Sequence, residues 1–159
     1  ENMLSSVEQA GCQTAYGVAG DTFTLGDAQL KLLWPTEGFD ASDPNEISLV
    51  LQVTYGEYSF LLTGDAGKDA EEGFLSQVQP VTVLKAGHHG SNTSSTEAFL
   101  QKAQPEYVVI SVGAGNSYGH PSPAMLERLD ENCQVLRTDE KGSIVFTVKE
   151  GELHVSTAR

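Results

Sequence analysis

"VLKAGHHGSNTSS", residues 83–95, decides the fold, because in it an apolar run ends in a loop that carries two adjacent histidines. The run predicts a short strand over 81–85. The hydroxyl- and amide-rich residues after the loop suit the start of a helix, which we expect over about 95–103. His88 and His89 are two of the four histidines in the chain. They are either ordinary loop residues or part of a functional site.

The segments around this stretch predict hairpins followed by alternating strands and helices. Upstream, the Gly26-Asp27 turn and a turn at 55–57 each join two strand-like runs. This order indicates a sheet covered by helices on one face, which is an α+β arrangement. The other expected elements are helices at 1–10, 68–77 and 122–131, a strand at 107–112, and short C-terminal strands with turns at 140–142 and 149–151.

Each of three consecutive predicted strands ends in a residue that can bind a metal ion. "FLLTGD" ends in Asp65, the strand at 81–85 leads to His88 and His89, and the strand at 107–112 leads to His120. Ligands usually bind at the carboxyl ends of strands in sheets covered by helices. Carboxylate and imidazole are ligands for zinc, manganese or iron, and an aspartate can bridge two cations. The pattern therefore predicts a metal site at one sheet edge.

Structural interpretations compete with this prediction for single residues. Asp65 alone could be a turn or N-cap residue of the helix expected at 68, and His120 alone could be a loop residue before a helix. We expect His154 to be a surface or structural residue. We expect Glu71 and Glu72 to lie on the solvated face of their helix.

The amino-acid composition limits the classes of function that this chain can have. Lys and Arg number 9 against 22 Asp and Glu, a formal net charge of −13, which disfavours broad adhesion to nucleic acid or an anionic membrane. Cys12 and Cys133 belong to no motif, and we expect buried or free thiols in preference to a disulfide or a metal role. The chain contains no apolar run of the roughly 18 residues that a membrane helix requires and has no signal-peptide pattern at its start. It does not begin with Met, so we expect a piece of a longer protein.

Four motifs together resemble a known family. "TGDA", "VLKAGHHGSNTSS" and "VISVGAGNSYGHPSPAMLERL", followed by "LRTDEKGSIVF", are similar to the metallo-β-lactamase-fold domain of competence DNA-uptake channel proteins and of free-standing hydrolases. The resemblance covers almost the whole chain. It implies an αββα sandwich with two divalent metal ions, zinc or manganese, at one sheet edge. It also implies cleavage of phosphodiester or related bonds.

The resemblance assigns roles by position. Asp65 corresponds to the metal-bridging aspartate and His120 to a late histidine ligand. Of His88 and His89, one would be a ligand and the other would contact the scissile phosphate and protonate the leaving oxygen. We assign His88 to the metal and His89 to catalysis, and the reverse order stays open. The family also places substrate-lining polar residues at two further positions, Ser91 and Asn116.

One feature of the family pattern has no counterpart here. The family's first metal motif, His-x-(His or Asp)-x-Asp-His, should precede Asp65, and no histidine precedes Asp65 in this chain. We therefore expect residues 1–159 to be the C-terminal portion of one metallo-β-lactamase-like domain, with the N-terminal part of the domain as its missing partner. On its own the chain is expected to be inactive and to bind metal weakly or not at all.

Two functions from different classes follow. The first is a metal-dependent hydrolase of phosphodiester-type substrates, with DNA as a candidate substrate and an extracytoplasmic location if the domain belongs to a DNA-uptake channel. The alternative is a non-catalytic structural or interaction module that retains the fold. β-Lactam hydrolysis is disfavoured, because "HHGS" and "NSYGHP" resemble the phosphodiesterase-like branch of the family.

Overall fold

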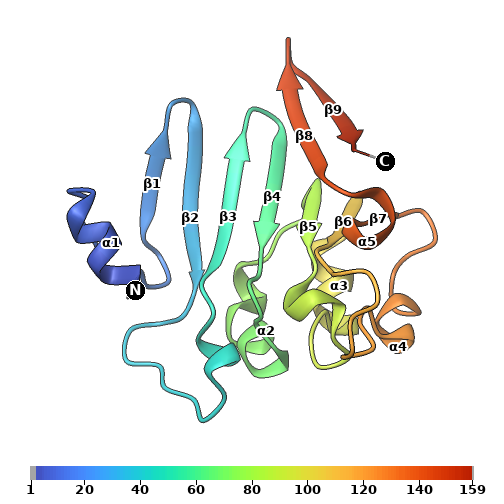
Figure 1. Ribbon diagram of the computed structural model, residues 1–159, viewed down its shortest axis with the longest axis horizontal. Coiled ribbons are helices and arrows are strands. Elements are labelled where there is room, and N and C mark those ends of the chain that lie inside the picture. Colours follow the sequence, from blue (N-terminus) through green and yellow to red (C-terminus); the bar gives the residue numbers. More distant parts are fainter. Residues whose placement is uncertain (1–2, 159) are drawn as a thin grey trace.

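A seven-stranded sheet dominates the computed structural model, which describes residues 3–158 (Figure 1). Its strands follow chain order, with β1 to β4 antiparallel and β4 to β7 parallel. The expected α+β class is therefore confirmed. The strands are β1 (Thr22–Leu25), β2 (Ala28–Trp34), β3 (Val50–Tyr55), β4 (Tyr58–Leu62), β5 (Val83–Lys85), β6 (Tyr107–Ile110) and β7 (Gln134–Arg137).

Helices α2 and α3 cover one face of this sheet. Leu61, Leu84 and Val108 are register partners in three adjacent strands, so their side chains share that face, and all three are buried. Phe74 of α2 and Phe99 of α3 pack edge to face with ring centroids 5.6 Å apart in the same core. The helical segments are α1 (Met3–Gln9), η1 (Pro44–Ile47), α2 (Lys68–Phe74), η2 (Leu75–Gln77), η3 (Gly87–Gly90), α3 (Glu97–Ala103), α4 (Pro123–Leu126) and α5 (Thr138–Lys141).

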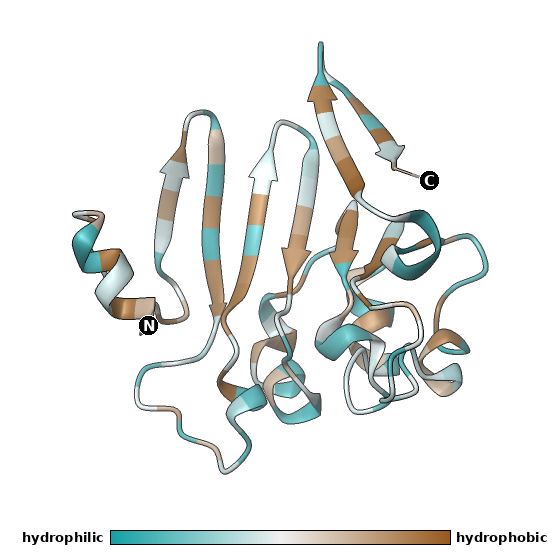
Figure 2. Cartoon of the chain, in the orientation of Figure 1, coloured by the Kyte–Doolittle hydropathy of each residue, from teal (hydrophilic) through white to brown (hydrophobic). Residues whose placement is uncertain are grey.

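The other face of the sheet carries a two-stranded hairpin of β8 (Ile144–Lys149) and β9 (Glu152–Thr157). Phe146 of β8 packs edge to face on Phe60 and Tyr107, with ring centroids 6.0 and 5.5 Å away. Figure 2 shows hydrophobic and hydrophilic residues alternating along β2 and along β9, the period expected of strands whose two faces differ. None of the helices described between residues 3 and 158 is long and apolar enough to cross a membrane.

Several predicted elements differ in length from those observed. The helix expected over 122–131 is wrong in extent, because α4 ends at Leu126 and the chain continues in i→i+3 turns such as Leu129 N–H to the Leu126 carbonyl. Asp130 then accepts a hydrogen bond from the backbone N–H of Asn132, which stabilises a turn in place of helix. Of the turn expected at 140–142, residues 140 and 141 lie instead in the short helix α5, and Gly142 is its C-cap. The N-terminal helix is described from Met3, and residues 1–2 of that prediction lie outside the described residues.

Candidate functional site

Three neighbouring parallel strands bring the predicted site residues to one edge of the sheet. β4, β5 and β6 run parallel, so their carboxyl ends meet there, as the strand-end pattern predicted. Asp65 follows β4, and the loops after β5 and β6 carry a histidine cluster of His88, His89 and His120. The imidazole ring of His88 lies 6.3 Å from that of His89 and 5.8 Å from that of His120, measured between centroids.

The two adjacent histidines occupy a backbone conformation that side chains rarely adopt. His88 and His89 have φ values of 46° and 56°, both in the left-handed region. For residues with a Cβ, this region is disfavoured by about 1–2 kcal/mol each. The buried hydroxyl of Ser94 donates a 2.8 Å hydrogen bond to the Gly87 carbonyl, and the His88 N–H donates to the Gly64 carbonyl at 3.1 Å. Such strain, held by surrounding contacts, is typical of functional sites.

Gly87 allows this turn to pack closely against the loop after β4. A Cβ at Gly87 would lie 2.9 Å from the carbonyl oxygen of Ala66 and 3.1 Å from the Cβ of Ser94. Backbone atoms cannot move aside cheaply, so only glycine fits at this position. The close approach places the histidine turn beside Asp65.

His89 has one ring nitrogen fixed by the backbone. Its Nδ1 lies 2.7 Å from the Ser111 carbonyl oxygen, which can only accept, so Nδ1 carries the hydrogen. In the neutral imidazole Nε2 is therefore unprotonated, and it lies 3.8 Å from Oδ1 of Asp65. Histidines that bind metals or transfer protons commonly have their other nitrogen oriented in this way.

Asp65 lies in a turn but does not cap helix α2. The N-cap of α2 is Gly67, which has no side-chain cap, and the Glu46 carboxylate accepts the hydrogen bond from the Ala70 N–H at 2.7 Å. The interpretation of Asp65 as a helix cap is therefore wrong. The Asp65 N–H itself donates to Oγ of Ser48 at 3.1 Å, which fixes the turn and leaves the carboxylate facing the histidine cluster.

Lys85, at the end of β5, ties the Asp65 turn to the histidine turn. Its Nζ donates to the carbonyl oxygens of Gly64 and Ala86 at 3.1 and 3.2 Å. Burial lowers the pKa of this ammonium group, and the nearby negative charge of Asp65 opposes that effect. No pattern in the sequence distinguishes Lys85, because a lysine at a strand end is common on solvated surfaces.

His120 contributes a buried ring nitrogen to the cluster. Its Nδ1 has no hydrogen-bond partner among the described residues. Burial lowers the pKa of His120, and the neighbouring imidazoles of His88 and His89 add to this effect. An unpaired buried nitrogen of this kind is unfavourable unless it meets an ion, a ligand or water.

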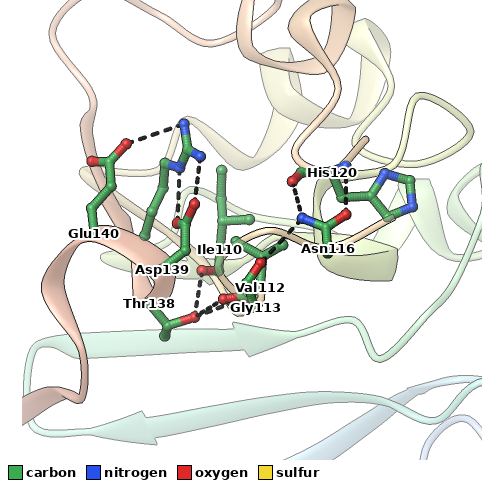
Figure 3. Close-up of polar contacts among 9 residues, drawn as sticks. Ile110, Val112, Gly113, Asn116, His120, Thr138, Asp139 and Glu140 are labelled. Atoms are coloured by element: carbon green, nitrogen blue, oxygen red, sulfur yellow. Dashed lines mark hydrogen bonds and ion pairs between the residues drawn. The ribbon is translucent and has the colours of Figure 1, made fainter. Parts of the chain in front are cut away.

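Asn116 organises the loop that carries His120 (Figure 3). Its Nδ2 donates to the carbonyl oxygens of Gly113 and His120 at 3.2 and 2.6 Å. Its Oδ1 accepts from the N–H groups of Tyr118 and His120, both at 3.1 Å. The amide thus makes four hydrogen bonds within its own loop. Its predicted contact with substrate stays a prediction.

Thr138, the first residue of α5, fixes the point where that loop leaves β6 (Figure 3). Its Oγ1 accepts from the N–H of Val112 at 2.8 Å and also lies 2.8 Å from the Val112 carbonyl oxygen, to which it can donate. Arg137 beside it pairs with Asp139 at 2.7 Å and with Glu140 at 3.2 Å. The base of the His120 loop is therefore fixed by contacts from the segment after β7.

Ser91 is buried directly after the histidine turn. Its Oγ lies 3.0 Å from Oγ1 of Thr93 and accepts from the Thr93 N–H at 3.3 Å. These contacts form a small hydroxyl-lined turn between the histidines and α3. The substrate-binding role of Ser91 stays a prediction.

Glu71 corrects the expectation of a solvated acidic pair. Glu72 is exposed, but Glu71 is only 1% exposed. Its two carboxylate oxygens accept from the N–H groups of Ser95 and Thr96 at 2.6 and 2.8 Å. Burial raises the pKa of Glu71, and these hydrogen bonds work against the rise. Its spacing from Phe74, one helical turn later on the buried face of α2, is the sequence signal that could have revealed it.

Arg128, after α4, holds the segment between the histidine turn and α3. Its guanidinium donates to the carbonyl oxygens of Asn92 and Ser94, both at 3.1 Å, and to that of Ser95 at 3.4 Å. It also contacts Oδ1 of Asn92. A planar group with several donors suits this arrangement. Separated by more than thirty positions from the residues it contacts, Arg128 had no local signal in the sequence.

The donor chemistry of this edge suits a divalent metal ion, but the ligand set is incomplete. Asp65 and the histidine cluster offer a carboxylate and imidazoles, and Nδ1 of His120 lacks a partner within residues 3–158. Over those same residues, no group of three or more His, Cys, Asp or Glu side chains is arranged to hold a metal ion. The described residues therefore offer donor atoms that a metal ion could use, without forming a full site among themselves.

Comparison with known proteins gives one family and several relatives. Residues 37–114 match the metallo-beta-lactamase superfamily. The chain is 36% identical over 152 residues to ComE operon protein 3 of Bacillus subtilis, with 94% of the chain and 20% of that protein covered. It is 38% identical over 133 residues to competence protein ComA of Neisseria gonorrhoeae, and the match covers 81% of the chain and 19% of that protein. A third relative is recombination protein 2 of Haemophilus influenzae, 34% identical over 116 residues, where the match covers 72% of the chain and 15% of that protein. The chain thus spans a fifth or less of the length of these relatives.

Proposed function

Because this chain carries a domain of the metallo-β-lactamase superfamily, we propose that it contributes the strand-edge residues of a metal-dependent hydrolase acting on phosphodiester-type bonds. The observation that carries the proposal is the convergence of Asp65 and the histidine cluster at one sheet edge, where His88 and His89 lie on a turn held in left-handed backbone conformation. A purely structural loop has no need for strained imidazoles at that place.

The residues of this chain have distinct roles in the proposal. Asp65, His88 and His120 supply metal ligands, and the remaining ligands come from the N-terminal part of the same domain. Divalent ions in such enzymes activate water and offset negative charge that develops on phosphate oxygens. His89, with Nδ1 held by the Ser111 carbonyl, carries a proton on Nε2 when charged and donates it to the leaving oxygen. Asp65 Oδ1, 3.8 Å from that nitrogen, is placed to pair with the protonated ring.

DNA is the candidate substrate in this proposal. One relative is named as a competence protein, one as a ComE operon protein and one as a recombination protein. The formal charge of −13 disfavours a broad DNA-binding surface, so the contact with substrate should be confined to the site itself. A domain that acts in DNA uptake would work on the extracytoplasmic side.

An Asp65→Asn variant tests the proposal in the protein expressed from its complete gene. Asn keeps the size of the side chain and removes the negative charge that a bridging ligand needs. Bound metal is measured by elemental mass spectrometry, and turnover is measured on a chromogenic phosphodiester and on single-stranded DNA with zinc or manganese. Asp27→Asn, in the exposed turn between β1 and β2, is the matched control.

The proposal expects bound metal and turnover in the wild type and in Asp27→Asn, and loss of both in a folded Asp65→Asn variant. Unchanged turnover in Asp65→Asn would exclude the bridging role. If the wild type binds no metal and cleaves neither substrate, the function is the alternative one, a non-catalytic structural or interaction module.

A further inference from the structure

Tyr118 is an exposed aromatic residue beside the histidine cluster. Its side chain is 82% exposed, and its ring stacks on the imidazole of His120 with centroids 6.1 Å apart and an interplanar angle of 16°. Its backbone is held in place, because the Tyr118 N–H donates to Oδ1 of Asn116 at 3.1 Å. One ring face is therefore turned to His120, and the rest of the ring offers flat apolar surface to solvent.

Two cavities flank the cluster, and they differ in charge. The one on the Asp65 side has a volume of about 510 Å³ and also borders His88. The one on the Tyr118 side has a volume of about 450 Å³ and borders both His89 and His120. No carboxylate is among the described residues that line the Tyr118 cavity, which include Ser111, Asn116 and Thr138. The Asp65 cavity is lined by five, namely Asp43, Glu46, Asp65, Asp69 and Glu97.

This difference decides where the organic part of an anionic substrate can lie. Five carboxylates repel a polyanion, and Lys68 and Arg128 in the same lining offset only part of that charge. The guanidinium of Arg128 already donates hydrogen bonds to backbone carbonyl oxygens, which leaves fewer of its donors for a substrate. The Tyr118 cavity has no negatively charged side chain in its described lining, so it does not repel an anion in this way. The aromatic ring of Tyr118 lies at its border.

We propose that Tyr118 and the Tyr118 cavity form a subsite that stacks one unpaired nucleobase next to the bond being cleaved. This rests on the proposed function and narrows its substrate to phosphodiesters that contain a nucleoside. Stacking on an aromatic face tolerates every base, because each base has a π-face, so the subsite gives little sequence preference. A base paired within a duplex has no free face to offer, so the subsite selects single strands or strand ends.

A binding experiment on the protein expressed from its complete gene tests the subsite without relying on turnover. The probe is a short single-stranded oligonucleotide with hydrolysis-resistant phosphorothioate linkages and one 2-aminopurine, a base whose fluorescence falls when it stacks. A base-free strand with the same backbone serves as the matched ligand. Variants are Tyr118→Ala, Tyr118→Phe and the control Tyr16→Ala, which changes a fully exposed tyrosine in the N-terminal loop.

We expect the wild type to quench the fluorescence of 2-aminopurine. We also expect Tyr118→Ala to raise the Kd of the base-bearing strand by about 5- to 150-fold, the range that stacking of one base supplies. Tyr118→Phe and Tyr16→Ala should bind like the wild type, and the base-free strand should bind all four proteins equally. Because Tyr118 is largely exposed, circular dichroism of Tyr118→Ala should match that of the wild type.

Three results would overturn the subsite. They are a wild type that does not quench the probe, a Tyr118→Ala variant that binds the base-bearing strand normally, and a Tyr118→Phe variant that binds as weakly as Tyr118→Ala. Failure of the proposed function is a separate result, because it shows as absent turnover on every phosphodiester whatever the binding data give.

Discussion

Nδ1 of His89 donates a 2.7 Å hydrogen bond to the carbonyl oxygen of Ser111, which joins the loop after β5 to the end of β6. The bond leaves Nε2 as the nitrogen free to act on a substrate. It also makes the two nitrogens of this ring separable by mutation.

His89→Asn tests the role of Nε2. The asparagine amide can take the position of Nδ1 and keep the bond to Ser111, while nothing replaces Nε2. We expect phosphodiester turnover to fall by about 10²–10⁴-fold, the usual contribution of an acid–base group, with thermal stability unchanged. His154→Asn, on the exposed hairpin, is the control and should keep wild-type turnover. A fully active His89→Asn protein would transfer the acid role to His88.

Glu71 should make stability depend on pH. Its pKa in the folded protein lies above the ordinary glutamate value of 4.5, chiefly because of burial. The folded state therefore holds this proton more tightly than the unfolded state does. The resulting stabilisation is complete below about pH 4.5 and is lost as pH rises through the folded-state pKa. Glu71→Gln removes this dependence, and its single acceptor oxygen can serve only one of the two N–H groups, so the free energy of unfolding of the wild type should decrease relative to that of the variant as pH rises.

Urea unfolding of both proteins between pH 4 and 8 measures that difference, with Glu72→Gln as the exposed neighbour that should behave like the wild type. Glu71→Ala should lose about 1–3 kcal/mol, because the buried N–H of Ser95 and that of Thr96 lose their acceptor. Parallel pH profiles for wild type and Glu71→Gln would show that another group titrates.

Asn116→Asp should loosen the His120 loop. The substitution replaces two donated hydrogen bonds with a carboxylate oxygen that faces the carbonyl oxygens of Gly113 and His120. Lost donors of this kind cost about 1–3 kcal/mol, so amide hydrogen exchange over 113–120 should accelerate by about 5- to 150-fold. Asn132→Asp, in the exposed turn after α4, is the matched charge control. Unchanged exchange over 113–120 would mean that Asn116 does not hold the loop.

Arg128→Lys should destabilise the segment before α3 even though the positive charge is kept. An ammonium group cannot reproduce the planar fork that donates to the carbonyl oxygens of Asn92, Ser94 and Ser95. We expect Tm to fall by several degrees, corresponding to about 1.5–3 kcal/mol, with faster hydrogen exchange over 91–96. Lys102→Arg on the exposed side of α3 should leave both unchanged. A lysine variant with wild-type Tm would show that only the charge matters.

Much of the fold was predictable because it depends on local patterns. Alternation over 49–53 and the turn at 55–57 predicted the β3–β4 hairpin, and the change to alternating strands and helices predicted the parallel part of the sheet. The meeting of Asp65 and the histidine loops at one edge followed from that parallel order. The length of α4 was not predictable in the same way, because the side chain of Asp130 competes with the helix for backbone hydrogen bonds.

The supporting residues of the site were harder to foresee. Glu71 and Glu72 are adjacent and chemically alike, and only the approach of the α3 N-terminus makes one of them a buried acceptor. Asn116 could have faced a substrate, but its amide forms hydrogen bonds with four backbone groups of its own loop. The left-handed backbone at His88 and His89 is imposed by contacts from the loop after β4 and from Ser94, because histidine itself does not prefer it.

By itself, the sequence determined the order of strands and helices and the chemistry at each strand end, because hydrophobic period and residue type are local properties. The tertiary structure alone decided which side chains support that chemistry. It buried Glu71, fixed the nitrogen that His89 presents, and left Tyr118 exposed beside His120. Each of these outcomes depends on contacts between segments that a local pattern does not connect, since burial and hydrogen bonding are set by what the folded chain brings near.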